Sequence, residues 1–321
     1  MLGFIEITPW HWAGFILCVL IFLAFDLGVF HRGARLVKFK EALAWSALWF
    51  ALAMLFSVAM IYWRGHEEAI QFTAGYLIEL SLSLDNILVI ALIFAWFRVP
   101  LEFQHRVLFW GILGALLMRG AMIAVGVALI HRFGWVLYVF GAFLVFAGAR
   151  MFFARQETVQ LGKNLVLRLV KKFFPVASDF DGHKFFTRLN ARRALTPLAL
   201  VLLLVETTDL IFAVDSVPAV FSVTQKAFIV FTSNVFAVLG LRSMYFLLAG
   251  ALGCFRYLKF GLSVVLVFIG VKMLLDPHGH EPKWFQIEIP AGVSLLVIAA
   301  ILLISITLSV TAAQREKKAV Q

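Results

Sequence analysis

The chain has 321 residues, of which 63% are hydrophobic and 14% are charged, and its formal net charge at pH 7 is +10. Soluble domains are about 45–50% apolar, so this composition excludes a water-soluble globular protein and indicates a polytopic membrane protein. The two cysteines exclude a disulfide framework, and neither belongs to a CxxC metal motif.

The hydropathy pattern predicts an all-α membrane protein with about nine transmembrane helices, each near the ~20 residues needed to cross a bilayer. In chain order, the predicted spans are 9–31, 39–63, 70–97, 105–130, 134–153, 196–221, 227–250, 258–275 and 287–312. No basic segment precedes the first span and no small-residue cleavage site follows it. We therefore expect a retained helix there and not a signal peptide.

Most basic residues lie in alternate loops between these spans. The loop after the first span, the 154–195 segment and the C-terminal tail are all rich in lysine and arginine, whereas the opposite loops carry few. Because positively charged loops stay in the cytoplasm, this bias predicts an outside N-terminus and a cytoplasmic C-terminus. The net positive charge is thus a topology signal and gives no reason to expect a nucleic-acid partner.

Two stretches place acids inside predicted spans. They are "YLIELSLSLDN", from Tyr76 to Asn86, and "VETTDLIFAVDS", from Val205 to Ser216. An acid at the centre of a membrane helix costs roughly 2.5–3.5 kcal/mol on insertion scales, and such acids are functional-site candidates by default. The intramembrane acids are Glu79, Asp85, Glu206, Asp209 and Asp215.

The two acidic stretches belong to an internal repeat. The matching markers are Glu79 with Asp209, Asp85 with Asp215, Asn86 with Ser216, Arg119 with Arg242, and Arg150 with Lys272. Each repeat covers three spans, and the second repeat begins three spans after the first. An odd offset makes the repeats cross the membrane in opposite directions, which is the inverted-repeat plan of many secondary transporters.

This repeat divides the chain. The segment "GKNLVLRLVKKFFPV" in its middle is either an amphipathic helix on the anionic inner leaflet or a solvated basic linker. The predicted parts are two leading transmembrane helices (1–69), the first three-helix repeat (70–153), a basic cytoplasmic connector (154–195), the second repeat (196–275), and the last helix with the tail (276–321).

The acids and their polar neighbours predict a mid-membrane metal site. Carboxylate, amide and hydroxyl oxygens suit Mg²⁺, Ca²⁺ or Mn²⁺. Acids six residues apart on an intact helix point about 120° apart, so we expect breaks that let them converge, one of them at Pro218. The predicted metal ligands are Glu79, Asp85, Asn86, Glu206, Asp209, Asp215 and Ser216.

Charge balance adds further expectations. Adjacent carboxylates should take up protons when the ion leaves, and Arg119 and Arg242 are predicted to neutralise the empty site. The alternatives are that these arginines snorkel or cap a helix, or that ion pairing only fixes helix packing. Asp26 and the outer-loop residues His278, His280 and Glu281 are weaker candidates.

The stretches "YLIELSLSLDN", "VETTDLIFAVDS" and "SNVFAVLGLRSMYFLL" resemble the TerC/Alx family of bacterial integral membrane proteins, from about residue 10 to 312. The resemblance implies a nine-span plan like that of the LysE superfamily, a link to manganese efflux, and an acidic site formed by the five acids. Many relatives have a basic residue where this chain has Leu80, which changes the local charge balance but not the acids.

The leading hypothesis is an exporter of the bacterial inner membrane that exchanges Mn²⁺ for protons. No phosphate loop, nucleophile triad or zinc-protease motif is present, so we expect no enzyme activity and no permanently bound cofactor. The expected partners are Mn²⁺ or another divalent cation, protons and membrane lipids. Two alternatives stay open, namely a non-transporting factor that supports metallation or insertion of other proteins, and a tellurium resistance protein.

Overall fold

The computed structural model of the chain describes residues 7–30, 39–153, 165–189, 192–249, 258–277 and 286–320. Within these ranges eight helices are long and apolar enough to cross a membrane, and α1 adds a shorter apolar stretch over Pro9–Ala24. The predicted all-α polytopic fold is confirmed. The long helices are α1 (Pro9–Phe30), α2 (Phe39–Arg64), α3 (His66–Trp96), α4 (Leu101–Arg132), α5 (Val136–Phe153), α7 (Pro197–Phe221), α8 (Ala227–Ala249), α9 (Leu258–Leu275) and α10 (Ala291–Val320).

The largest differences from the predicted spans lie at helix ends. Helix α3 begins at His66, four residues before its predicted span, because the preceding turn needs one residue only. Gly65 makes that turn with φ at 94°, a conformation that glycine adopts at little cost. Helix α4 begins directly after Pro100, whose fixed φ suits a helix start.

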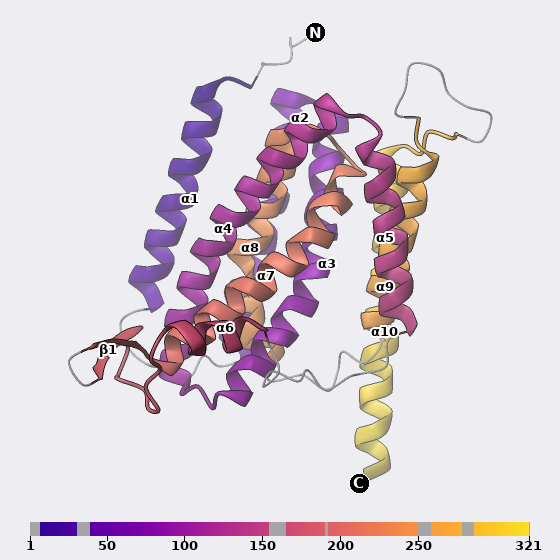
Figure 1. Cartoon of the computed structure of the whole chain (residues 1–321). Coiled ribbons are helices and arrows are strands. Elements are labelled where there is room, and N and C mark those ends of the chain that lie inside the picture. Colours follow the sequence, from indigo (N-terminus) through magenta and orange to yellow (C-terminus); the bar gives the residue numbers. More distant parts are fainter. Residues whose placement is uncertain are drawn as a thin grey trace.

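The helices form a central group with two flanks (Figure 1). Helices α3 and α4 each pack against both α7 and α8, and α2 packs on α3 and α8. Helix α8 has the largest buried share of the spans. Figure 1 shows α5, α9 and α10 together on one side of this group and α1 on the other. The inner helices therefore provide a lipid-shielded place for polar side chains.

Helices α5 and α9 cross at glycines. A Cβ atom added to Gly270 would lie 2.7 Å from the carbonyl oxygen of Gly141, and one added to Gly148 would lie 2.8 Å from that of Ser263. In the repeat, Gly148 matches Gly270 and Gly141 matches Ser263. Each contact is therefore the repeat equivalent of the other. Their order along the two helices shows that α5 and α9 run antiparallel. Reciprocal antiparallel contacts are the arrangement that inverted repeats produce.

The predicted helix breaks are wrong. Helix α3 is continuous over His66–Trp96, and α7 is continuous over Pro197–Phe221 with Pro218 inside it. Pro218 lies in the last turn of α7, where few helical hydrogen bonds follow it, so the missing N–H does not interrupt the helix. The acids on each helix consequently keep the angular spacing of an intact helix.

The connector contains a short helix and a β-hairpin. Helix α6 (Leu165–Phe173) buries Leu167 in the core that α7 shares, so the amphipathic-helix alternative for this segment is confirmed as far as its secondary structure goes. Strands β1 (Phe186–Leu189) and β2 (Arg192–Leu195) pair antiparallel, a feature that the sequence did not predict. Thr196 ends the hairpin and caps α7 by accepting a hydrogen bond from the Ala199 N–H at 3.3 Å.

Candidate cation site

One arginine on α4 bridges an acid from each repeat. The Arg119 Nη1 donates to Glu79 Oε2 at 2.5 Å, while Nη2 and Nε donate to the two carboxylate oxygens of Asp209 at 3.0 and 3.2 Å. Glu79 comes from α3 and Asp209 from α7. The guanidinium fork thus engages Asp209 bidentately, which is the strongest geometry for this pair of groups.

Two asparagines complete this network. The Asn86 amide donates to Asp209 Oδ1 at 2.6 Å, and the Asn234 amide donates to Glu79 Oε1 at 2.7 Å. Asn86 is two helical turns from Glu79 on α3, so both face the same direction. All members are 0–3% exposed. These five residues, Glu79, Asn86, Arg119, Asp209 and Asn234, are called the buried network below.

The charges of the buried network do not cancel. Two carboxylates face one guanidinium, so the ionised network carries one excess negative charge. Glu206 lies one turn before Asp209 on α7 and interacts electrostatically with it. Removing one partner from a buried pair leaves an uncompensated charge, at a cost of about 3–5 kcal/mol. The network therefore holds four helices together only while the guanidinium, or another cation, stays between the acids.

The structure gathers three of the seven predicted metal ligands and separates the others. Within the described ranges, no hydrogen bond or ion pair joins Asp85, Glu206 or Asp215 to the buried network, and Ser216 Oγ is buried without a partner. Asp85 instead interacts electrostatically with Lys259 of α9. The continuous helices explain the separation, because Asp85 and Asp215 point about 120° away from Glu79 and Asp209.

Glu206 stands against the backbone of α4. A Cβ atom at Gly114 would overlap the carboxylate of Glu206, so only glycine leaves room for it. One oxygen of Glu206 is buried and has no hydrogen-bond partner among the described residues. In the described part of the chain, no group of three or more His, Cys, Asp or Glu side chains is arranged to hold a metal ion. This conformation therefore presents a site filled by Arg119.

The two predicted charge-balancing arginines have different surroundings. Arg119 contacts both repeat acids, whereas Arg242, which is 4% exposed, lies with Nη2 3.2 Å from His105 Nδ1 of α4. The interaction of Arg119 is the one expected of a neutralising group. Arg242 occupies the equivalent repeat position but lies outside the buried network.

A second asymmetry lies beside Asp209. Asn234 is eight residues before Arg242, and the position eight residues before Arg119 is Gly111. One repeat thus has an amide where the other has a glycine. Beside Gly111 lies a cavity of about 20 Å³, also lined by Asn86 and Asp209, which is enough for one water molecule.

Polar groups continue from this cavity toward the connector end. Tyr245 also lines the cavity, and its hydroxyl donates to Gln104 Oε1 at 2.9 Å. Gln104 in turn donates to the carbonyl oxygen of Val99, just before α4. These groups link the neighbourhood of Asp209 to one end of the bundle.

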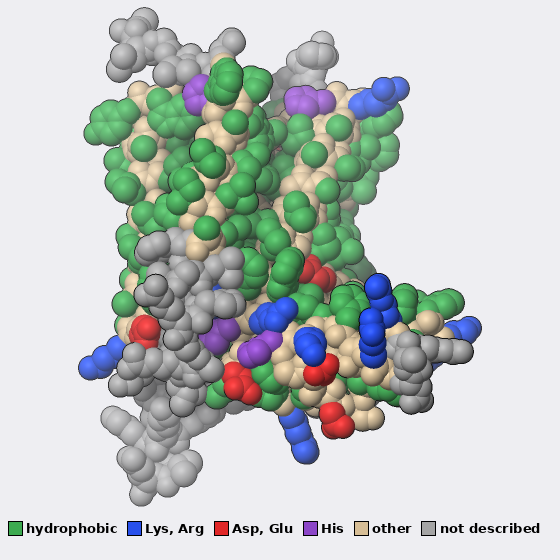
Figure 2. All heavy atoms as spheres, turned by 90° about the vertical axis from the view of Figure 1, so that its left-hand side faces the viewer, with side chains coloured by type: hydrophobic (Ala, Val, Ile, Leu, Met, Phe, Trp, Pro, Cys, Tyr) green, Lys and Arg blue, Asp and Glu red, His purple; other side chains and the backbone are tan. Residues whose placement is uncertain are grey.

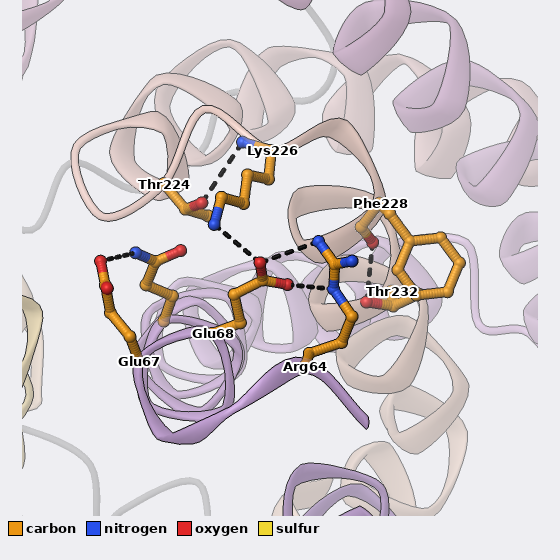
Figure 3. Close-up of polar contacts among 8 residues, drawn as sticks. Arg64, Glu67, Glu68, Thr224, Lys226, Phe228 and Thr232 are labelled. Atoms are coloured by element: carbon orange, nitrogen blue, oxygen red, sulfur yellow. Dashed lines mark hydrogen bonds and ion pairs between the residues drawn. The ribbon is translucent and has the colours of Figure 1, made fainter. Parts of the chain in front are cut away.

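The opposite end of the bundle is tied by a second charged cluster (Figure 3). Glu68 accepts hydrogen bonds from Arg64 Nε and Nη2 at 2.6 and 2.8 Å and from Lys226 Nζ at 2.7 Å. Glu68 lies eleven residues before Glu79 on α3, about three turns, and so shares its face. A cavity of about 740 Å³ lined in part by Glu67, Lys226, Lys272, Asp276 and Glu288 opens at this end.

Sequence reasoning missed Asn234 and the Glu68 cluster. A single amide in an apolar span was the available signal for Asn234, but its repeat partner is a glycine, so the repeat did not highlight it. Glu68 was placed outside the span that begins at residue 70. The side chain of Asp26 and the residues His278, His280 and Glu281 lie outside the described part of the structure.

In the described part of the chain, eight membrane-length helices and the shorter apolar stretch of α1 accompany a buried charge network, which defines a polytopic integral membrane protein with an ionisable core. The model of the "Integral membrane protein TerC family" matches residues 64–317, and the chain belongs to this family.

Several relatives match over nearly their whole length. An uncharacterised membrane protein, STKORF319, from Myxococcus xanthus is 52% identical over 94% of this chain and 92% of its own. A relative from Escherichia coli strain K12, provisionally named membrane-bound redox modulator Alx, is 44% identical over 97% of each chain. No solved structure matches the chain.

Proposed function

We propose that this protein is a divalent-cation transporter of the bacterial inner membrane that exports Mn²⁺ in exchange for protons. Its N-terminus would lie outside and its C-terminus in the cytoplasm. The observation that supports this most directly is the placement of one carboxylate from each repeat, Glu79 and Asp209, on either side of a single buried cationic group.

Arg119 acts in this proposal as an internal substitute for the transported ion. The incoming ion takes the place of the guanidinium between Glu79 and Asp209. Asn86 and Asn234 now turn their NH₂ groups toward the acids, and rotation of each amide would present its carbonyl oxygen instead. Two carboxylate groups and two amide oxygens are hard ligands of the kind that Mn²⁺, Mg²⁺ and Ca²⁺ accept.

Proton exchange follows from the charge of the emptied site. When the ion leaves, Arg119 returns and neutralises one of two neighbouring carboxylates. The remaining negative charge, with Glu206 one turn away, favours protonation of one acid. Asp85, Glu206, Asp215 and Ser216 remain candidate ligands for a second conformation, in which one repeat has moved against the other.

The path proposed for the ion runs along one face of α3. From the connector end, it passes the small cavity beside Asp209 and then Glu79. It leaves past Glu68, where Arg64 and Lys226 hold the outer end closed in this conformation. Opening that end requires Lys226, the residue just before α8, to separate from Glu68 of α3.

Manganese flux into or out of proteoliposomes tests this function. We expect purified wild-type protein to move Mn²⁺ when a pH gradient is imposed, with protons moving in the opposite direction. E79Q and D209N should reduce the flux to background, while E102Q, at the exposed start of α4, should leave it unchanged. Absence of Mn²⁺ movement under every pH gradient would sink the proposal.

The same preparation separates the alternatives. A factor that only supports metallation or insertion of other proteins would produce no Mn²⁺ flux in liposomes. Cells lacking it would still lose metal from secreted enzymes. Resistance to tellurium oxyanions through this site is disfavoured by its charge, because the carboxylates repel an anion.

A further inference from the structure

Two arginines face each other across the connector hairpin. In the antiparallel register, Arg188 of β1 lies directly opposite Arg193 of β2, and both side chains are exposed. Like charges at directly opposed positions destabilise a strand pair. Within the described ranges, no acid forms an ion pair with either arginine. The hairpin therefore presents two unneutralised cationic groups side by side.

These arginines line a hollow with further charged groups. A cavity of about 790 Å³ is lined in part by Lys184, Arg188, Arg193 and Asp181. Asp181 is the one acid among the described residues of this lining, and Lys184 Nζ lies 3.5 Å from its carboxylate. Thr187 donates a hydrogen bond to Asp181 and lowers the pKa of its carboxyl group, so Asp181 stays ionised at neutral pH. The described charged side chains of this lining therefore sum to +2, which suits an anion.

The hollow lies where the bundle meets the lipid headgroups. Leu195, another lining residue, stands two positions before α7, which crosses the membrane from Pro197. Arg106, in the second turn of α4, stacks over Phe185 at 5.0 Å, which fixes the hairpin against the ends of two spanning helices. Figure 1 shows the β1 region projecting sideways from the bundle at this end, so one of its surfaces faces the membrane plane.

Exposed aromatic residues surround the cationic groups. Phe186 is 65% exposed and lies two residues from Arg188, on the same face of β1. Phe173 and Phe174, at the end of α6, are 71% and 56% exposed. Figure 2 shows Lys and Arg side chains gathered at the lower end of the molecule beside hydrophobic ones. Aromatic residues next to basic ones are typical of segments that lie at a membrane interface.

We propose that the hairpin binds the phosphate of an anionic phospholipid headgroup between Arg188 and Arg193, with Lys184 as a third cationic group. Guanidinium groups bind phosphate oxygens through paired N–H donors. The phosphate would remove the repulsion between the arginines, while Phe186 enters the headgroup region. The aromatic surroundings and the membrane-end location favour a lipid over free phosphate as the source of this group.

Lipid retention by the full-length protein tests this proposal. The protein is reconstituted in nanodiscs of phosphatidylcholine with a minor share of phosphatidylglycerol, extracted, and examined by native mass spectrometry. We expect wild-type protein to retain phosphatidylglycerol, and R188Q/R193Q to retain it about fivefold less for each charge removed. R132Q, exposed at the opposite end of the bundle, should behave as wild type. D181N should retain more lipid, because it removes a negative charge from the lining of the hollow.

Thermal unfolding in detergent gives an independent readout. Without anionic lipid, R188Q/R193Q should be at least as stable as wild type, because it lacks the opposed charges, and added phosphatidylglycerol should stabilise only the wild type. Equal lipid retention by the two proteins would overturn the proposal. So would a less stable variant in the absence of lipid, which would make the arginines structural. Equal stabilisation of wild type by inorganic phosphate alone would assign the site to a free anion.

Discussion

Arg119 and Arg242 occupy equivalent positions in the two repeats, yet only Arg119 bridges the two repeat acids. Arg119 donates to Glu79 and Asp209, whereas Arg242 lies beside His105. A similar contrast separates Asn234, which donates to Glu79, from Gly111, which leaves a small cavity next to Asp209. The helix crossing of α5 and α9 stays symmetric. The repeats therefore share a scaffold and differ in the polar groups that it carries.

The largest effect should come from removing the bridging arginine. R119Q leaves Glu79 and Asp209 close together and unpaired in the membrane interior, which we expect to cost about 3–5 kcal/mol of folding free energy. R242Q leaves Arg119 between Glu79 and Asp209, so it should not expose these two acids to each other and should cost less. Thermal unfolding of the purified variants measures the difference.

A compensated variant tests the cause of this loss. E79Q/R119Q/D209N replaces all three charged groups by neutral side chains, and those at the two acid positions keep the shape of the originals, so part of the stability should return while Mn²⁺ flux does not. If R242Q proved as damaging as R119Q, the two arginines would be equivalent and the asymmetry would have no energetic meaning.

The second effect concerns the donor present in one repeat only. N234L removes the amide that donates to Glu79, and a buried acceptor without its donor costs about 1–3 kcal/mol. Chemical denaturation in detergent measures this loss. Q225L, at an exposed position before α8, is the control and should change little, and an equal loss in both proteins would mean that the Asn234 contact contributes nothing specific.

The symmetric crossing should respond equally on both sides. In G270A the new Cβ atom meets backbone atoms of Gly141 and Val145 at 2.7 Å, and in G148A it meets the Ser263 carbonyl oxygen at 2.8 Å. Backbone cannot move aside locally, so each variant should lose about 1–3 kcal/mol. G292A, whose Cβ atom would meet nothing within 4 Å, should be tolerated. A loss in only one of the two crossing variants would argue against the pseudo-two-fold relation.

The smallest effect is expected at Gly111. A Cβ atom there meets only a methyl group of Val205, at 3.2 Å, a contact that a side chain can relieve. Alanine also suits a helix better than glycine, by roughly 0.5–1 kcal/mol. G111A should therefore be neutral or slightly stabilising, in contrast to N234L at the equivalent position. A strong loss of stability in the same unfolding assay would show that the cavity beside Asp209 is filled and structurally needed.

The sequence predicted the scaffold better than the site. Hydropathy located the spans because a lipid-facing helix must be apolar along its length. The repeat singled out Glu79, Asp209 and Arg119 because a charged residue in a membrane span is rare and recurs at matching positions. What these patterns could not supply was the rotation of each helix against its neighbours.

Helix continuity explains the main error in the predicted site. We expected Pro218 to break α7 and bring Asp215 toward Asp209, but a proline three residues before the helix end disrupts little. The contacts of Asn234 and of the Glu68 cluster join helices far apart in the sequence, so no local sequence pattern could predict them. The β-hairpin was not predicted because its strands are only four residues long, which is too short for a clear alternating pattern.

Equilibrium binding of radioactive Mn²⁺ to the purified, folded protein tests the central claim most directly. If Glu79 and Asp209 form one cation site that Arg119 fills when it is empty, wild-type protein should bind Mn²⁺ saturably. E79Q and D209N should each lose that binding while E102Q retains it. Unchanged binding by both E79Q and D209N would contradict the account, because the ion would then be held by other groups than the two repeat acids.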